Sequence, residues 1–138
     1  MGKRREGREA ALQFLFSNEL NQLNTEAERS AFWQLRRAKP LVRTFAEELI
    51  EGTSKHLEEI DSLINAATPD YDLHRIANVD RNILRIAIFE LIHLTEVPQP
   101  VVMNEAIEMG KRFSGEESGK FINAVLDSIR KKLAIAGH

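Results

Sequence analysis

Residues 79–94, VDRNILRIAIFELIHL, decide the fold. Over residues 79–95 the apolar side chains fall on most of the circumference of a helix instead of on a single stripe. A helix that is apolar nearly all round is buried, so the rest of the chain is expected to pack around it. Arg85, Glu90 and His93 interrupt the run, which is therefore not expected to span a membrane.

The chain before this central stretch predicts four helices. The first is expected over residues 3–23, because its apolar residues recur at i, i+3 and i+4; they are Leu12, Leu15, Phe16, Leu20 and Leu23. Thr25 and Glu28 have the spacing of a capping box, which predicts a second helix that starts there and ends before Pro40. One long third helix is expected over residues 41–67, with His56 on its apolar face. A short helix that includes Leu73 and Ile76 is expected after it.

Two more helices are predicted after the central one. Pro98 and Pro100 start a helix whose apolar residues are Val102, Ala106, Met109 and Phe113. Residues 114–117, SGEE, form a second capping box and predict the start of the last helix. The expected fold is all-α: a single compact bundle of about seven helices that fills one domain over residues 1–138.

Composition places the chain among ordinary globular proteins. The 138 residues are 43% hydrophobic and 29% charged, and the net charge is −2, so bulk charge gives no reason to expect nucleic-acid binding. The absence of cysteine excludes disulfides and fits a reducing compartment. Residues 1–9 are charged and lack the apolar segment of a signal peptide. A cytoplasmic protein without membrane contacts is therefore expected.

Signals for an enzyme are weak. Glu105 and Glu108 stand three residues apart, but the Glu-x-x-His pairs of a bundle metal site do not occur. The four histidines, at 56, 74, 93 and 138, have no ligand spacing, and for His56 a hydrogen-bonded position in the core or at its boundary is favoured over a ligand role. No glycine-rich phosphate loop is present. No catalytic residue, metal or cofactor is therefore expected.

Charge is nevertheless unevenly distributed. Residues 3–8 contain three more bases than acids, and so do residues 111–132, whereas residues 45–61 hold six acids and one lysine. Two basic regions and an acidic helix could serve two partners of opposite charge, although such runs are usually solvated helix faces.

Phe121 adds a specific indication. It projects about 100° from the centre of the apolar stripe of the last helix, beside Lys120. An aromatic ring next to a cation at the edge of the core suits base stacking with phosphate neutralisation. Taken alone, packing of Phe121 on a neighbouring helix is the favoured interpretation.

Four blocks then carry a resemblance to a known family. They are REAALQFLF at residues 8–16, VDRNILRIAIFEL at 79–91, VP at 97–98 followed by VMNEAIE at 102–108, and KFINAVLD at 120–127. In this order, and over nearly the whole chain, they resemble the NusB family of transcription antitermination factors.

The resemblance implies two packed helical subdomains and a function without catalysis. It implies binding to boxA RNA together with the ribosomal protein NusE, loading onto the RNA polymerase antitermination complex, and processive transcription of ribosomal RNA operons. The implied RNA contacts are Lys3, Arg4, Arg5, Arg8, Glu117, Lys120 and Phe121. Those to NusE are Phe16 and Asp80, to which the acidic residues of the predicted third helix could add.

Three departures and two alternatives accompany the resemblance. Many relatives have tyrosine at the position of Phe16, and Gly110 and Ala124 stand where alanine and glycine are usual. A helical adaptor that binds only proteins remains the main alternative, and an RNA-binding enzyme is the other. Some family members form homodimers, and the sequence leaves the oligomeric state open.

Overall fold

The computed structural model describes residues 2–21 and 25–135, and it is all-α over those residues. Leu23, where the first helix was expected to end, lies outside them. The helices are α1 (Lys3–Asn21), α2 (Glu26–Leu35), α3 (Pro40–Lys55), α4 (Leu57–Ala67), α5 (Asn78–His93), α6 (Gln99–Phe113) and α7 (Glu116–Ile135), with a 3-10 turn, η1, at Leu73–Arg75. The predicted fold class and the count of about seven helices are confirmed.

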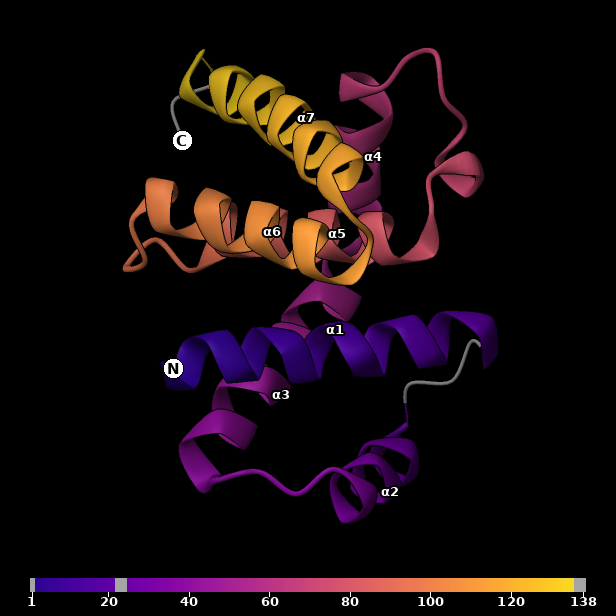
Figure 1. Cartoon of the computed structure of the whole chain (residues 1–138), viewed down its shortest axis with the longest axis vertical. Coiled ribbons are helices and arrows are strands. Elements are labelled where there is room, and N and C mark those ends of the chain that lie inside the picture. The colour runs from indigo at the N-terminus through magenta and orange to yellow at the C-terminus, as the bar shows by residue number, and fades with distance from the viewer. Residues whose placement is uncertain (1, 22–24, 136–138) are drawn as a thin grey trace.

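The helices form two layers around α5 (Figure 1). In the view of Figure 1, α1, α2 and α3 make up the lower part, and α4, α6 and α7 make up the upper part. Helix α1 packs on both α3 and α5, while α6 and α7 pack on each other and on α5. Helix α5 is thus the element that both layers share.

The burial of α5 confirms the prediction made from residues 79–94. Every residue from Asp80 to Leu91 is buried, including Arg81, Arg85 and Glu90. Around it the core collects apolar side chains from α1, α3, α4, α6 and α7; the largest that are fully buried include Phe14, Leu49, Ile50, Ile60, Ile64, Ile122, Leu126 and Ile129. The charged residues of α5 are thus enclosed by an apolar core and need partners there.

The long third helix predicted over residues 41–67 is wrong. The chain breaks at His56, whose φ of −105° and ψ of 22° are not helical, so α3 and α4 are separate helices. Helix α3 packs on α1 and α5, whereas α4 packs on α5 and α7. Both halves are amphipathic, so their apolar spacing continued across the break and did not reveal the change of direction.

The predicted helix boundaries held in part. Thr25 caps α2, because its Oγ1 accepts a hydrogen bond of 3.1 Å from the Glu28 amide, and α2 ends at Leu35, before Pro40 as predicted. The cap predicted at Ser114 is wrong: Ser114 ends α6, and Gly115, with a φ of +115°, makes the turn into α7. A positive φ favours glycine, which explains its place there. The predicted short helix is η1, and Ile76 lies just after it.

None of the described helices is both long enough and apolar enough to cross a membrane.

Candidate nucleic-acid interface

Arg8, expected to contact RNA, lies inside the fold. Its side chain is 3% exposed and forms a two-pronged ion pair with Glu90 of α5, with Nη2 2.7 Å from Oε1 and Nε 2.9 Å from Oε2. The guanidinium also lies 5.5 Å from the centre of the Phe45 ring. Arg8 therefore joins α1 to α5 and is not presented to a ligand.

At the other end of α1 the charges are reversed: the acid is on α1 and the arginines are on α5. Glu19 of α1 accepts hydrogen bonds from Arg81 (2.7 Å) and from Asn82 (2.6 Å), and lies 3.2 Å from Arg85. Arg85 in turn pairs with Asp61 of α4. Burial alone would raise the pKa of Glu19, but these hydrogen bonds and nearby cations outweigh it and lower that pKa. The seam between α1 and α5 is thus closed by buried charges at both ends.

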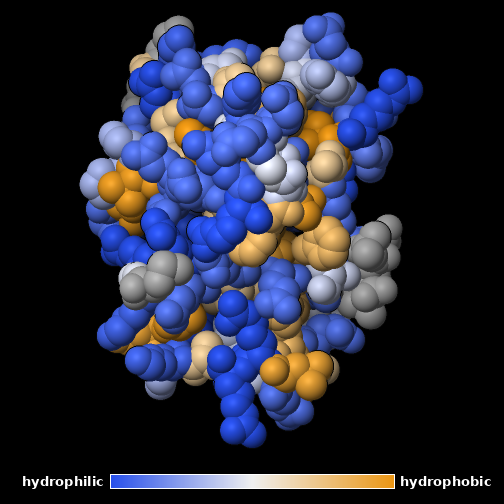
Figure 2. Space-filling view, in the orientation of Figure 1, coloured by the Kyte–Doolittle hydropathy of each residue, from blue (hydrophilic) through white to orange (hydrophobic). Residues whose placement is uncertain are grey.

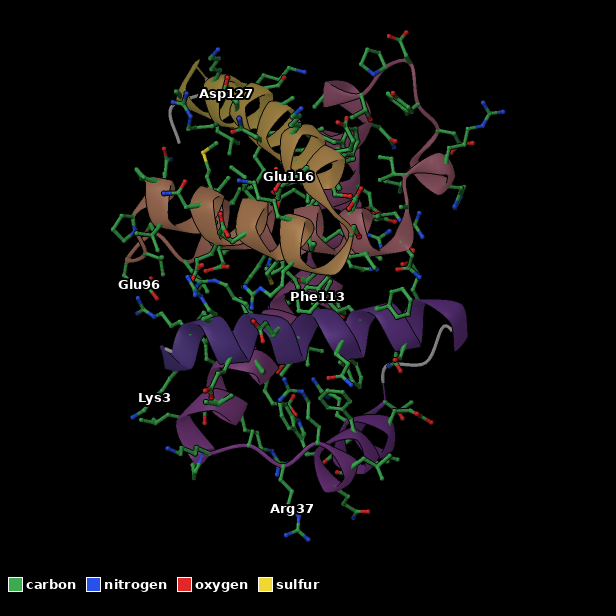
Figure 3. The ribbon with its side chains drawn as sticks, viewed as in Figure 1. Lys3, Arg37, Glu96, Phe113, Glu116 and Asp127 are labelled. Atoms are coloured by element: carbon green, nitrogen blue, oxygen red, sulfur yellow. The ribbon has the colours of Figure 1, made fainter. Side chains whose placement is uncertain are left out.

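The remaining cations of the first turns of α1 are more accessible. Lys3 and Arg4 are exposed, and Lys3 projects away from the protein in Figure 3. Arg5 is 38% exposed and donates to Glu105 of α6, with Nε 3.0 Å from Oε1 and Nη2 2.9 Å from Oε2. That hydrogen bond lowers the pKa of Glu105. The four predicted cations are therefore divided between surface and interior.

The start of α7 presents the other predicted contacts. The side chains of Glu117 and Lys120 are 92% and 74% exposed, and they form a loose pair at 3.6 Å. Phe121 is partly buried against the core, and its ring meets that of Tyr71 edge-on, with centroids 6.0 Å apart. Tyr71 is 54% exposed. Sequence reasoning missed Tyr71, because nothing in its own segment indicates that it lies beside α7.

These two groups of residues lie on different parts of the surface. The start of α1 is at one end of its layer, and α7 begins in the other layer, beyond the end of α6 (Figure 1). Helix α6 lies between them: its Glu105 binds Arg5, and the Lys111 side chain lies against Gly119, next to Lys120. A ligand that touched both groups would have to be extended.

A hollow of about 390 Å³ lies where the layers meet. It is lined by Glu9, Leu12, Gln13, Phe16, Arg36, Val79 and Phe113. Phe16 and Phe113 are 38% and 48% exposed, and Figure 3 places Phe113 between α6 and α1. Figure 2 shows apolar surface in this region surrounded by hydrophilic residues. Polar contacts close the rim, where Arg36 donates to Gln13 (2.8 Å) and Arg112 pairs with Glu9.

Asp80, the second residue expected to contact NusE, is only 8% exposed. Its Oδ2 accepts a hydrogen bond of 3.2 Å from Ser118 of α7, whereas its buried Oδ1 has no partner among the described residues. Burial raises the pKa of Asp80, and the Ser118 hydrogen bond partly offsets the rise. Phe16 thus lines the hollow and is accessible to a partner. Asp80 does not line the hollow, and its carboxylate contacts α7.

Comparison with known proteins agrees with this arrangement. The sequence model of the NusB family matches residues 5–131. The chain belongs to the NusB family. The transcription antitermination protein NusB of Sorangium cellulosum is 41% identical over 133 residues, which cover 96% of this chain and 95% of that protein.

Solved NusB structures have the same fold. A crystal structure of T. maritima NusB is 33% identical, with a TM-score of 0.83 over 95% of this chain and 92% of that one. A crystal structure of the antitermination factors NusB and NusE in complex with double-stranded RNA matches with 28% identity and a TM-score of 0.87, covering 96% of this chain and 98% of that chain.

One departure from the usual NusB residues has a packing explanation. A Cβ added at Gly110 would lie 2.5 Å from Cδ1 of Ile122, so the glycine leaves the space that the Ile122 side chain fills. Ala124 lies on the exposed side of α7, and nothing in the structure explains its replacement of glycine.

Proposed function

We propose that this chain is a transcription antitermination factor that binds boxA RNA jointly with NusE and promotes processive transcription of ribosomal RNA operons. The observation that carries the proposal is the likeness, over nearly the whole chain, to a NusB solved with NusE and RNA. The work would be assembly without catalysis, in the cytoplasm, on the RNA polymerase antitermination complex.

The proposed RNA surface has two parts. Lys3, Arg4 and Arg5 at the start of α1 would neutralise phosphates, and Lys120 would do so at the start of α7. Phe121, with Tyr71 against its ring, would offer an aromatic platform for an unstacked base. Glu117 would be a contact beside Lys120. An extended RNA strand crossing α6 would reach both parts.

Arg8 takes a different part in this proposal from the one that the resemblance implied. Its guanidinium is held by Glu90 and covered by Phe45, so binding a phosphate would first require a buried ion pair to break. We therefore assign Arg8 to positioning: it fixes the first turns of α1, and with them Arg4 and Arg5, on α5.

The hollow lined by Phe16 and Phe113 is the proposed NusE surface. Exposed aromatic rings in a concave, polar-rimmed site are typical of the centre of a protein interface. Phe16 lacks the hydroxyl that tyrosine supplies in many relatives, so its contribution would be apolar.

Asp80 would connect the two surfaces. Its neighbour Val79 lines the hollow, while its own carboxylate holds Ser118, two residues before Lys120. A shift of Val79 on NusE binding would therefore be passed through Asp80 to Ser118 and would change the position of the start of α7. By linkage, any gain in RNA affinity caused by NusE is matched by an equal gain in NusE affinity caused by RNA.

Fluorescence anisotropy with a labelled boxA RNA tests the function. We expect the RNA to bind more tightly when NusE is present, and boxA to be preferred over a scrambled sequence. Arg4→Gln should weaken binding, while Arg37→Gln, which removes an exposed cation on the far side of α2 and α3, should not. Equal affinity for both RNAs, with and without NusE, would support the protein-binding adaptor instead.

A further inference from the structure

Three side chains that are far apart in the sequence meet at the break between α3 and α4. His56 occupies the break, Glu59 lies in the first turn of α4, and His93 ends α5. The three side chains are 32%, 51% and 30% exposed, respectively. They are therefore held by the fold yet open to solvent on one side.

The donor atoms of these residues lie close together. Nε2 of His93 lies 3.0 Å from Oε1 of Glu59, and Nδ1 of His56 faces the same oxygen at 3.9 Å. One ligand atom from each residue can be chosen so that all three lie within 4.8 Å of one another. Ligand atoms around a tetrahedral zinc ion are about 3.4 Å apart, so movements of an ångström or so by solvent-exposed side chains would complete such a site.

The two imidazoles also lie on a common apolar support. Their rings stack with centroids 3.9 Å apart and an interplanar angle of 21°, and both lie against Phe89, at 6.1 Å from His56 and 5.5 Å from His93. Phe89 is itself fixed, because its ring lies where a side chain at Gly52 would be, 2.0 Å from a Cβ built there. An ion lies in the plane of each imidazole that binds it, so one of the two near-parallel rings would have to rotate out of the stack, while Phe89 remains a fixed apolar support beneath them.

A hydrogen-bonded histidine cluster accounts for only part of this geometry. The contact from His93 to Glu59 has the length of a hydrogen bond, but 3.9 Å is too long for one between His56 and the same oxygen. At 3.9 Å the His56 nitrogen and the Glu59 oxygen are close to the separation of two ligand atoms around one ion.

We propose that His56, Glu59 and His93 bind a divalent transition-metal ion. Two imidazole nitrogens and a carboxylate oxygen suit Zn²⁺, with water as a fourth ligand, and Ni²⁺ and Cu²⁺ are chemically similar alternatives. The ion would connect the α3–α4 break to the end of α5 and would stabilise the folded chain. This site is independent of the proposed RNA and NusE surfaces.

Calorimetric titration of the full-length, tag-free protein with ZnCl2, after removal of metals with a chelator, tests the proposal. We expect one ion to bind with a micromolar Kd, and Zn²⁺ at about 100 times Kd to raise the Tm by about 10 °C. His56→Gln, His93→Gln and Glu59→Gln should each weaken binding by more than about tenfold.

Matched controls separate the site from general surface binding. His74→Gln removes another exposed histidine, on η1, and Glu58→Gln removes the exposed acid next to Glu59; both should bind Zn²⁺ as the unmodified protein does. Nitrogen-15 spectra of the imidazoles should shift for His56 and His93 and remain unchanged for His74. Circular dichroism of the metal-free variants checks that each is folded. The proposal is overturned if no ion binds, or if the His56 and His93 variants retain full affinity.

Discussion

The fold places two charged pairs, Arg8–Glu90 and Lys120–Glu117, in opposite environments. The first is 3% and 1% exposed, with nitrogen and oxygen 2.7 Å apart. The second is 74% and 92% exposed, at 3.6 Å. A solvated pair at that distance contributes little to stability, whereas breaking a buried pair leaves an uncompensated charge in the core.

This contrast separates the cations that build the protein from those that can bind a partner. Arg8, Arg81 and Arg85 are held in the α1–α5 seam, where exchange for a phosphate would be costly. Lys3, Arg4 and Lys120 are exposed and can neutralise phosphates at little cost. The predictions below test that division.

The largest effect is expected for Arg8→Met. It leaves Glu90 buried without its cation, and we expect a loss of about 3–5 kcal/mol in the free energy of unfolding. Urea denaturation measures this. The double variant Arg8→Met, Glu90→Met should recover most of the loss, because no buried charge remains. A single variant as stable as the unmodified protein would mean that Arg8 is not part of the core.

Phe121→Leu tests the exposed region. Leucine keeps apolar contact with the core but cannot stack on a base, so RNA affinity should fall by about 1–3 kcal/mol while the protein remains folded. Anisotropy measures the affinity, and circular dichroism the fold. Phe113→Leu, in the hollow, is the matched control and should leave binding of RNA alone unchanged. If both variants bind RNA equally well, Phe121 serves only packing.

Phe16→Ala should weaken NusE binding by about 1–2 kcal/mol, because it removes an aromatic ring from the hollow. Calorimetric titration of NusE into the variant measures this. RNA affinity in the absence of NusE should not change. An unchanged NusE affinity would place the partner on another surface.

The smallest expected effect is on the pH dependence of the free energy of unfolding. The pKa of Glu19 is lower in the folded chain than its ordinary value of 4.5, so Glu19 stabilises the fold above that pH and loses this contribution as pH falls below it. The stability difference between the unmodified protein and Glu19→Gln should therefore be largest near neutral pH and shrink in acid. Denaturation at several pH values measures it, with the exposed Glu26→Gln as a control. A difference independent of pH would contradict the role given to Glu19.

The central helix could be predicted from the sequence because its apolar residues cover most of its circumference. Glu90 and Arg85 within that stretch were a further signal, since charges in a buried helix need partners. The identity of those partners could not be predicted: Glu90 pairs with Arg8, 82 residues away, and spacing carries no information about such contacts.

The break at His56 escaped prediction for a related reason. Both α3 and α4 keep a helical apolar pattern and both pack on α5, and only their other partners, α1 for α3 and α7 for α4, reveal the change of direction. The contact of His56 with His93 depends on that break, so histidine spacing gave no indication of a cluster. On the proposed RNA surface, Phe121 could be singled out from its position on the helix, but its neighbour Tyr71 could not.

The most direct test of the account is the salt dependence of boxA RNA binding, which counts neutralised phosphates. Two variants are compared with the unmodified protein: the triple variant Lys3→Gln, Arg4→Gln, Lys120→Gln, and the double variant Arg8→Met, Glu90→Met. For single-stranded RNA each lost contact reduces the slope of log affinity against log salt by about 0.7. We predict a slope shallower by about 2 for the triple variant and an unchanged slope for the double variant. A slope that changes for the double variant and not for the triple would contradict the division between buried and exposed cations.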